Sequence, residues 1–554
     1  MKKKVPDTEI SYEDGVPLAP NIAPVIILCG SDYEMGYQYA RQINQIFGPW
    51  ALEKVKRNFT GEEFTTLKAY HSQLEEYAPE FIEMFHGIVA GAAEAGVTLS
   101  YEEVLADDCL AFNVPPVFRG LGRHESQESS PPADGCSGFA AWGSATIDGR
   151  LICGSSGDHP ISHELLVITM PETGDNYIFR GGLPRLSIHP AMNNKGLSYV
   201  HHGAGSNGNE IQGQGISGNL LAQHTLRFAG NVDEALKLQL GYPAGSLAAG
   251  LWADVDGNAL VLECRDPQVI RRAGDYDERD FLYATNNSLV PELRTFLENR
   301  FGWDLIYIPH GGWNLDDMNS VRRNLCMWNA LHNYHGQIDL DFVKMLWRFP
   351  SQPPDYPTLE EADIALYETK GLGWNTHICN LGNGMVGLML PDNGDKGLYY
   401  ACVGPAGRHA EPLTTDWHYY HISPTYTFFE LQLAATPADI TSTARKLAQY
   451  DLYYANRELR KLTYTDFAYA PLDSKFNRAA IENQKGNYYL ALAQNTKGNE
   501  SVCHYAKSVR SFTRCQAYAR HVYETLVPPA TRPTDLGLRE WFGSWGQWES
   551  YPSD

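Results

Sequence analysis

The chain has few cysteines, no excess of positive charge and no long apolar run. Its 554 residues include 10 cysteines and carry a formal net charge of -22. Scattered cysteines in apolar surroundings indicate reduced thiols rather than a disulfide framework. A strongly acidic chain is repelled by the negatively charged phosphate backbone of nucleic acids, so we expect no nucleic-acid partner. No stretch approaches the length of a membrane span, and we expect no membrane partner.

The first residues lack the pattern of a secretory signal. The segment MKKKVPDTEISYEDG begins with a positive cluster, but no apolar stretch follows it. We therefore expect a cytoplasmic protein. The composition, with 43% hydrophobic and 20% charged residues, is that of an ordinary folded protein.

Hydrophobic periodicity divides the chain into parts of different character. Residues 32–113 have helical spacing, and Asp32 is the expected N-cap of the first helix. Residues 119–135 are rich in Gly, Ser, Pro and charge, which is typical of an exposed loop or linker. From Cys136 onward, apolar runs joined by turn residues predict hairpins. The expected turns are Asp148-Gly149, Asp256-Gly257 and Asn393-Gly394.

Strand hairpins that alternate with helical segments predict an α+β fold. We expect an N-terminal helical segment in residues 1–135 and a layered core in residues 136–405 that ends near Pro405. Residues 406–554 contain long helical patterns and are expected to form a C-terminal helical extension.

One cysteine follows a glycine at the point where a polar loop meets an apolar run. The stretch is ADGCSGFAAW, with Cys136 as the first residue of the expected strand. A cysteine in such a place is most often a small buried hydrophobe. If the Gly135–Cys136 bond were cut, however, Cys136 would carry an α-amine that can act as a base beside its own thiol nucleophile. Gly135 has no Cβ, so its carbonyl can be approached closely.

These residues carry a resemblance to a family of self-processing enzymes. In chain order, the matching stretches are GSDYEMGYQYA, DGCSGF, TIDGRLICGSSGD, MNNKGLSYV, ADVDGNALVLE, YATNN and SVRR. The chain resembles the N-terminal nucleophile (Ntn) hydrolases, in particular the acyl-CoA:6-aminopenicillanic acid acyltransferase-like group, peptidase family C45. The choloylglycine hydrolases are more distant relatives. The resemblance covers roughly residues 30–405 and implies a four-layer αββα sandwich.

The resemblance also implies roles for individual residues. Cys136 is the expected nucleophile, exposed by cleavage after Gly135. Asp158 matches the aspartate that accepts a hydrogen bond from the new amino group. Asn286 matches the asparagine that helps to form the oxyanion hole, and Arg323 matches the arginine near the nucleophile. No cofactor and no metal is implied.

The sequence departs from the family pattern in several places. The segment between Cys136 and Asp158 is a few residues longer than usual, and Ser155-Ser156 stands where an asparagine often precedes the aspartate. His202-Gly203 occupies the region of a second oxyanion asparagine, so the second oxyanion donor stays open.

Less specific interpretations of the same residues also stay open. Asp158 has the context of a turn residue, and Asn286-Asn287 that of a loop pair. Arg322 competes with Arg323 for the family position, and both fit a solvated helix face.

A metal site is an alternative for the segment after the second expected strand. Asp158, His159 and His163 are residue types that bind metals. The spacing of the two histidines suits a metal only in a helix, and Pro160 argues against a helix there.

The expected reaction is cleavage of an amide bond in a small acylated metabolite through a Cys136 thioester. Transfer of the acyl group to an amine is the alternative, and a non-catalytic binding protein of the same fold is an alternative from another class. The expected partners are the substrate and the chain's own cleaved N-terminal part, residues 1–135. Homo-oligomerisation stays open.

Overall fold

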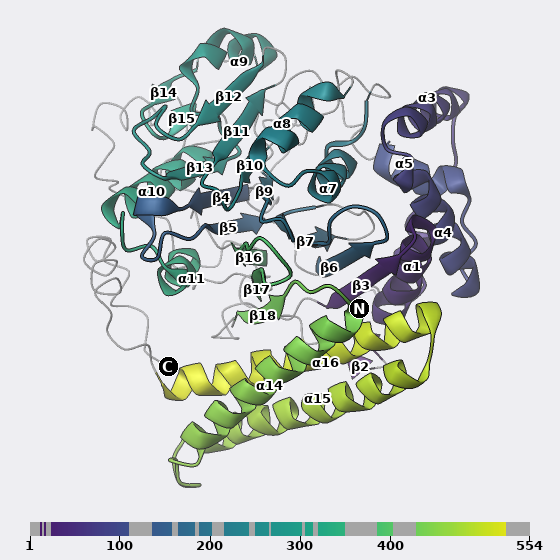
Figure 1. Ribbon diagram of the computed structural model, residues 1–554, viewed down its shortest axis with the longest axis vertical. Coiled ribbons are helices and arrows are strands. Elements are labelled where there is room, and N and C mark those ends of the chain that lie inside the picture. Colours follow the sequence, from purple (N-terminus) through teal and green to yellow (C-terminus); the bar gives the residue numbers. More distant parts are fainter. Residues whose placement is uncertain are drawn as a thin grey trace, which may run out of the picture.

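The structure is a computed structural model of the chain (Figure 1). It describes residues 12–13, 16–17, 24–109, 136–157, 164–182, 188–201, 215–242, 250–264, 268–301, 305–313, 319–348, 385–402 and 428–527. Among the helices of these ranges, none has both the length and the apolar character needed to cross a membrane.

The larger of two main sheets has eight strands in the order β12-β11-β10-β9-β8-β7-β6-β3. Neighbouring strands are antiparallel except β3, which runs parallel to β6 at one edge. Residues 1–135 were expected to be helical, but they also contribute the strand β3 to this sheet. The strands are β3 (Val25–Gly30), β6 (Glu164–Pro171), β7 (Tyr177–Gly182), β8 (Ala191–Asn193), β9 (Ser198–His201), β10 (Gly250–Ala253), β11 (Ala259–Cys264) and β12 (Val269–Arg272).

The smaller main sheet has six antiparallel strands in the order β13-β4-β5-β16-β17-β18. They are β4 (Cys136–Ala141), β5 (Ile152–Gly157), β13 (Phe281–Thr285), β16 (Met385–Leu390), β17 (Leu398–Cys402) and β18 (Phe429–Gln432). The three expected hairpin turns join β4 to β5, β10 to β11 and β16 to β17. β18 lies beyond Pro405, so the sheet continues into the segment that we assign to the helical extension. The exact domain boundaries stay a prediction.

Two short strand pairs and a set of helices complete the described elements. The pairs are β1 (Tyr12–Glu13) with β2 (Val16–Pro17), and β14 (Tyr307–Ile308) with β15 (Gly312–Trp313). The helices are α1 (Asp32–Phe47), α2 (Trp50–Glu53), α3 (Gly61–Tyr77), α4 (Glu80–Glu94), α5 (Tyr101–Cys109), α7 (Gly218–Phe228), α8 (Val232–Gly241), α9 (Arg294–Phe301), α10 (Asn319–Asn333), α11 (Leu340–Arg348), α14 (Pro437–Leu459), α15 (Tyr469–Asn495) and α16 (Gly498–Leu526). Single turns of 3₁₀ helix occur at Gly143–Ala145 and Pro291–Leu293.

Hydrophobic clusters show how the sheets and helices pack. One cluster joins the two sheets, with Ile168 and Val200 from the larger sheet and Ala140 from the smaller. The other face of the larger sheet packs against α1, α4, α7 and α8. The other face of the smaller sheet packs against α10 and α11. Each sheet therefore has the other sheet on one face and helices on the other, and the fold is α+β as predicted.

The start of α1 differs by one residue from the prediction. Ser31, not Asp32, is the N-cap: its hydroxyl accepts from the backbone nitrogen of Glu34, and the Glu34 carboxylate accepts from the Ser31 nitrogen. This reciprocal capping box needs an extended residue followed three positions later by Glu, which Ser31 and Glu34 supply. Asp32 is instead the first helical residue and pairs with Arg227 of α7.

Glutamine side chains cover the open backbone of the edge strand β3. Gln42 of α1 accepts from the Ile27 nitrogen at 3.1 Å and donates to the Ile27 oxygen at 2.7 Å. Gln38, one turn earlier, makes the same two bonds to Cys29, each at 2.8 Å. An amide side chain presents a donor and an acceptor side by side, so it can take the place of a neighbouring strand. The edge is thereby closed to pairing with another chain.

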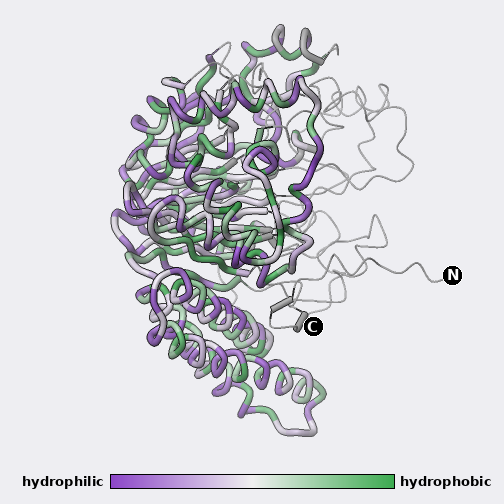
Figure 2. The backbone as a smooth tube through the Cα atoms, turned by 90° about the vertical axis from the view of Figure 1, so that its right-hand side faces the viewer, coloured by the Kyte–Doolittle hydropathy of each residue, from purple (hydrophilic) through white to green (hydrophobic). Residues whose placement is uncertain are grey.

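The helices α14, α15 and α16 lie together beside the edges of both sheets (Figure 1). Figure 2 shows hydrophobic and hydrophilic segments alternating along them, as expected for helices with one packed face. On β18, the Gln516 side chain of α16 bonds the nitrogen and oxygen of Glu430 at 3.1 and 3.0 Å. On β3, Arg510 of the same helix donates to the Val25 oxygen at 3.0 Å. The helix α16 thus forms hydrogen bonds with an edge strand of each sheet, β18 and β3.

Candidate active site around Cys136

Cys136 is the first residue of β4, between β5 and β13, and its side chain is buried. Alternation along a strand places residues two apart on the same face. Ala140, four residues later, belongs to the cluster between the sheets, so the Cys136 side chain also points between the sheets. Ser137 points to the opposite face, toward α10.

Asn286 follows the last residue of β13 and contacts the backbone of Cys136. Its Oδ1 accepts from the Cys136 nitrogen at 2.6 Å and from Arg323 Nη2 at 2.9 Å. Both partners are donors, so the amide oxygen must face them and the amide nitrogen must point the other way. The arrangement therefore fixes the direction in which Asn286 can donate.

Arg323 of α10 holds the start of β4 in place. Its side chain is buried, so the interpretation of this arginine as part of a solvated helix face is wrong. Nη1 donates to the Cys136 carbonyl oxygen and, at 2.9 Å, to Ser137 Oγ. Nη2 donates to Ser320 Oγ at 3.0 Å in addition to Asn286. The guanidinium thus links α10, β4 and the residue after β13.

The structure brings three of the predicted site residues together: Cys136, Asn286 and Arg323. Other residues of the prediction lie outside the described residues, and their places in the site stay predictions. They are Gly135, Asp158, the metal candidates His159 and His163, and His202-Gly203. The side chain of Arg322 also lies outside the description, although its backbone belongs to α10. Within the described residues, no group of three or more His, Cys, Asp or Glu side chains is placed to hold a metal ion.

The residue next to Asn286 anchors the loop that carries it. Asn287 Oδ1 accepts from the Trp313 nitrogen at 3.0 Å, and its Nδ2 donates to the oxygens of Trp313 and, at 3.3 Å, Gly311. Gly312 comes so close that an added Cβ would lie 2.3 Å from the Ser288 oxygen. The loop is therefore tied to the β14–β15 pair immediately beside the site.

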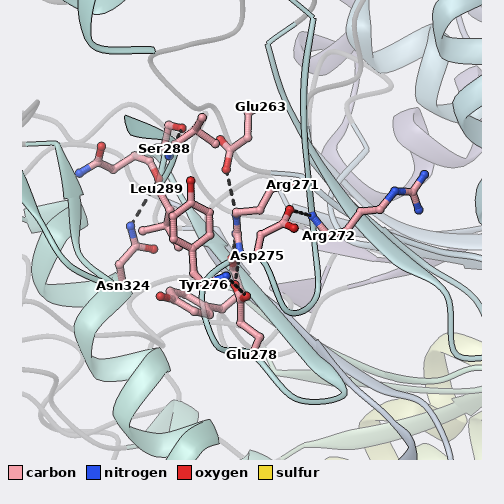
Figure 3. A network of polar contacts seen from close by, with 12 residues as sticks. Glu263, Arg271, Arg272, Asp275, Tyr276, Glu278, Ser288, Leu289 and Asn324 are labelled. Carbon is pink, nitrogen blue, oxygen red and sulfur yellow. Dashed lines mark hydrogen bonds and ion pairs between the residues drawn. The ribbon is translucent and has the colours of Figure 1, made fainter. Parts of the chain in front are cut away.

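A buried ion-pair network lies beside Ser288 and Leu289 of this loop (Figure 3). Arg271 of β12 contacts Glu263 at 3.2 Å and Glu278 at 2.5 Å, and it donates to the Tyr283 oxygen of β13. The network therefore joins an edge strand of the larger sheet to an edge strand of the smaller one. One guanidinium cannot neutralise two carboxylates. Burial accordingly raises the pKa of Glu263, although Arg271 and hydrogen bonds from Ser288 and Leu289 oppose the shift.

Sequence analysis missed residues that support the site. Ser137 and Ser320 accept from Arg323, and nothing in their sequence context distinguishes them from other serines. Arg180 of β7 carried a usable signal, because it is a charged residue inside the apolar strand YIFRGG and is buried there.

Comparison with known proteins leaves the family of this chain open. No family model matches it. A protein of Archaeoglobus fulgidus, itself described as uncharacterized, is 24% identical over 301 residues, which cover 48% of this chain and 50% of the relative. The chain thus spans about half the length of this relative.

Proposed function

We propose that the protein is a self-processing cysteine hydrolase of the Ntn type, which cleaves an amide bond in a small acylated metabolite. The observation that carries the proposal is that Asn286, which follows β13, and Arg323 of α10 both contact Cys136 at the first residue of β4. The layering of helices and sheets supports the finer expectation of a four-layer αββα sandwich.

Self-processing would begin with attack of Cys136 Sγ on the Gly135 carbonyl carbon. The bond from this carbon to the Cys136 nitrogen breaks, the nitrogen takes up a proton, and Gly135 is left as a thioester. Water then hydrolyses the thioester to a Gly135 carboxylate and a free thiol. The strand position supports this order, because Asn286 and Arg323 already hold the nitrogen and the carbonyl of Cys136.

Substrate turnover would use the same atoms. The Cys136 thiolate attacks the substrate carbonyl, and the Asn286 side-chain nitrogen helps to stabilise the oxyanion. The Cys136 α-ammonium protonates the departing amine, and water releases the acyl group from the thioester. The contacts of Asn286 Oδ1 support this role, since they leave the amide nitrogen directed away from two donors.

The first chain would stay bound after the cut. β3 pairs with β6 along its whole length, so residues 25–30 form the edge strand of a sheet whose other strands belong to the second chain. α7 adds polar contacts to three helices of the first chain. They are Arg227 with Asp32 at 2.5 Å, His224 with Glu80 at 2.5 Å and Ser217 with Asp108 at 2.8 Å.

Intact-mass analysis under denaturing conditions tests the cleavage. The proposal expects fragments 1–135 and 136–554 from the wild type and a single species from Cys136→Ala. Cys153→Ala, which changes another buried cysteine on β5, is the matched control and should be processed normally. A wild-type chain that stays intact and yet hydrolyses amides contradicts the proposal.

A panel of N-acyl amino acids, acyl polyamines, β-lactams and bile-salt-like amides tests the reaction. Addition of hydroxylamine should intercept the thioester as a hydroxamate. If no acyl donor ever labels Cys136 in a correctly folded protein, the binding-protein alternative replaces the enzyme.

A further inference from the structure

A buried arginine from the larger sheet faces the strand that carries Cys136. Arg180 lies on β7 and is 3% exposed. Ile178, two residues earlier, belongs to the cluster between the sheets, whereas Phe179 packs on the helical side. By strand alternation, Arg180 points between the sheets, as the Cys136 side chain does.

Gly157 shows where the guanidinium lies. A Cβ added to this glycine would be 2.0 Å from Arg180 Nη1, 2.9 Å from Cζ and 3.0 Å from Nη2. The guanidinium therefore occupies the place that a side chain at position 157 would take. Gly157 is the residue directly opposite Cys136 in the β4–β5 pair.

This pairing places the guanidinium beside the cysteine. Residues opposite each other in antiparallel strands project from the same face, with Cβ atoms about 5 Å apart. Combined with the 2.0 Å from the Gly157 Cβ position to Nη1, this puts Arg180 within roughly 7 Å of Cys136 Cβ. A cation at such a distance in a buried site favours a negatively charged neighbour.

We propose that Arg180 is a further residue of the Cys136 site, where its guanidinium stabilises the thiolate form of the nucleophile. The proposal rests on the proposed role of Cys136. Arg180 acts from the face of β4 on which the thiol lies, whereas Arg323 binds Ser137 on the opposite face.

Among the described residues, Tyr199 of β9 and His189, which precedes β8, are further titratable groups near the thiol. Burial raises the pKa of the Tyr199 phenol, and the charge of Cys136 adds to this shift, so Tyr199 stays neutral near pH 7. His189 contacts Ser155, which lies on the same face of β5 as Gly157, at 3.3 Å. Arg180 is the charged side chain that these described contacts place on the thiol face.

The test measures alkylation of Cys136 by iodoacetamide across a range of pH, with mass spectrometry of the cysteine peptide. Two variants address the same contact: Arg180→Met removes the charge, and Gly157→Ala keeps it but displaces the flexible end of the side chain. In both, alkylation at pH 7 should be at least about tenfold slower, and the midpoint of the pH profile should move upward. Arg180→Lys, which keeps a cation, should restore part of the rate.

Controls separate this effect from general damage. Arg510→Met removes another buried guanidinium, one that binds the edge of β3, and should leave the Cys136 profile unchanged. Cys153 is an internal reference, because burial raises its pKa to about 12 and it should stay unreactive near pH 7. An unchanged profile in both Arg180→Met and Gly157→Ala, or a wild-type Cys136 no more reactive than Cys153, overturns the proposal.

The readout is independent of processing and turnover. An uncut, inactive wild type with an Arg180-dependent alkylation profile rejects the proposed function and supports the role of Arg180. A processed, active enzyme whose alkylation profile does not depend on Arg180 supports the proposed function and rejects the role of Arg180.

Discussion

Asn286 Oδ1 lies 2.6 Å from the backbone nitrogen of Cys136, although 150 residues separate them in the chain. Arg323 shares the same oxygen and also binds the Cys136 carbonyl. The backbone of Cys136 is therefore held on both sides, at its nitrogen by Asn286 and at its carbonyl oxygen by Arg323. A nucleophile that must attack from one defined position needs this kind of fixed backbone.

Replacement of Asn286 by Ala should impair chemistry in addition to removing the hydrogen bonds to Cys136 and Arg323. If Asn286 is an oxyanion donor, as proposed, its loss costs about 3 kcal/mol in the transition state, and kcat/KM of the processed protein should fall by roughly 10²- to 10³-fold. Steady-state kinetics on the processed fraction measure this effect. The matched control is Asn287→Ala, which breaks the anchor to Trp313 and should lower the free energy of unfolding by about 1–3 kcal/mol. Full kcat/KM in processed Asn286→Ala would remove Asn286 from the mechanism.

The raised pKa of Glu263 predicts that the free energy of unfolding depends on pH. The folded protein holds the proton of this carboxyl more tightly than the unfolded chain, because burial raises its pKa. Its contribution to stability is therefore complete below the unfolded pKa, about 4.3, and is lost as the pH rises through the folded value. Glu263→Gln keeps the neutral form at every pH. Relative to wild type, this variant should gain stability as the pH rises, by up to about 1.4 kcal/mol per pH unit within that window.

Urea unfolding of both proteins between pH 4 and 8 measures this difference. Glu62→Gln, on the exposed face of α3, serves as the control and should track the wild type at each pH. A constant difference between Glu263→Gln and wild type across the range contradicts the raised pKa.

Gln516 protects the edge of the smaller sheet, and its loss should have two effects. In Gln516→Leu the backbone of Glu430 loses both partners, which should lower the free energy of unfolding by about 1–3 kcal/mol. The exposed strand edge should also increase aggregation near the unfolding transition, because unpaired edges add strands from other molecules. Thermal unfolding with light scattering measures both. Gln516→Glu retains an acceptor for the Glu430 nitrogen and should lie between wild type and Gln516→Leu.

Lys475 of α15 should react as a neutral amine at a lower pH than an ordinary lysine. Burial lowers its pKa to about 8, and its Nζ lies 2.5 Å from His521 Nε2 of α16. Acylation of Lys475, followed by peptide mass spectrometry, should have a midpoint near pH 8, compared with about 10.4 for an unperturbed lysine. Because the folded state binds this proton weakly, the contribution of Lys475 to stability should rise from pH 8 to pH 10. Lys446, exposed on α14, is the reference peptide; equal midpoints for the two contradict the prediction.

Local sequence signals predicted three of the hairpins and the position of Cys136, but not the β6–β7 and β8–β9 hairpins. The pairs Asp148-Gly149 and Asp256-Gly257 mark turns because glycine accepts a positive φ, and Gly149 and Gly257 have φ values of 77° and 86°. Cys136 begins its strand because the polar segment before it ends there. These features depend on neighbouring residues, so the sequence contains them directly.

Long-range relationships were much harder to infer. The approach of Asn286 and Arg323 to Cys136 followed only from family resemblance, since no local pattern joins residues so far apart. β3 and β18 were missed because a single edge strand has no hairpin turn to mark it. Gln42 and Gln516 look like ordinary helix residues until the strand edge that each one covers is known.

The bond from Arg510 to the Val25 oxygen spans 485 residues and has a consequence for synthesis on the ribosome. β3 emerges early, but its parallel partner β6 follows more than a hundred residues later, and α16 follows after most of the described chain has been made. Of the described side chains that bond the outer edge of β3, only Gln38 and Gln42 are present until then. Contacts of such high sequence separation form slowly. The nascent chain should therefore depend on chaperones until α16 has left the exit tunnel, and ribosome-bound chains that stop before Gly498 should remain sensitive to protease at β3.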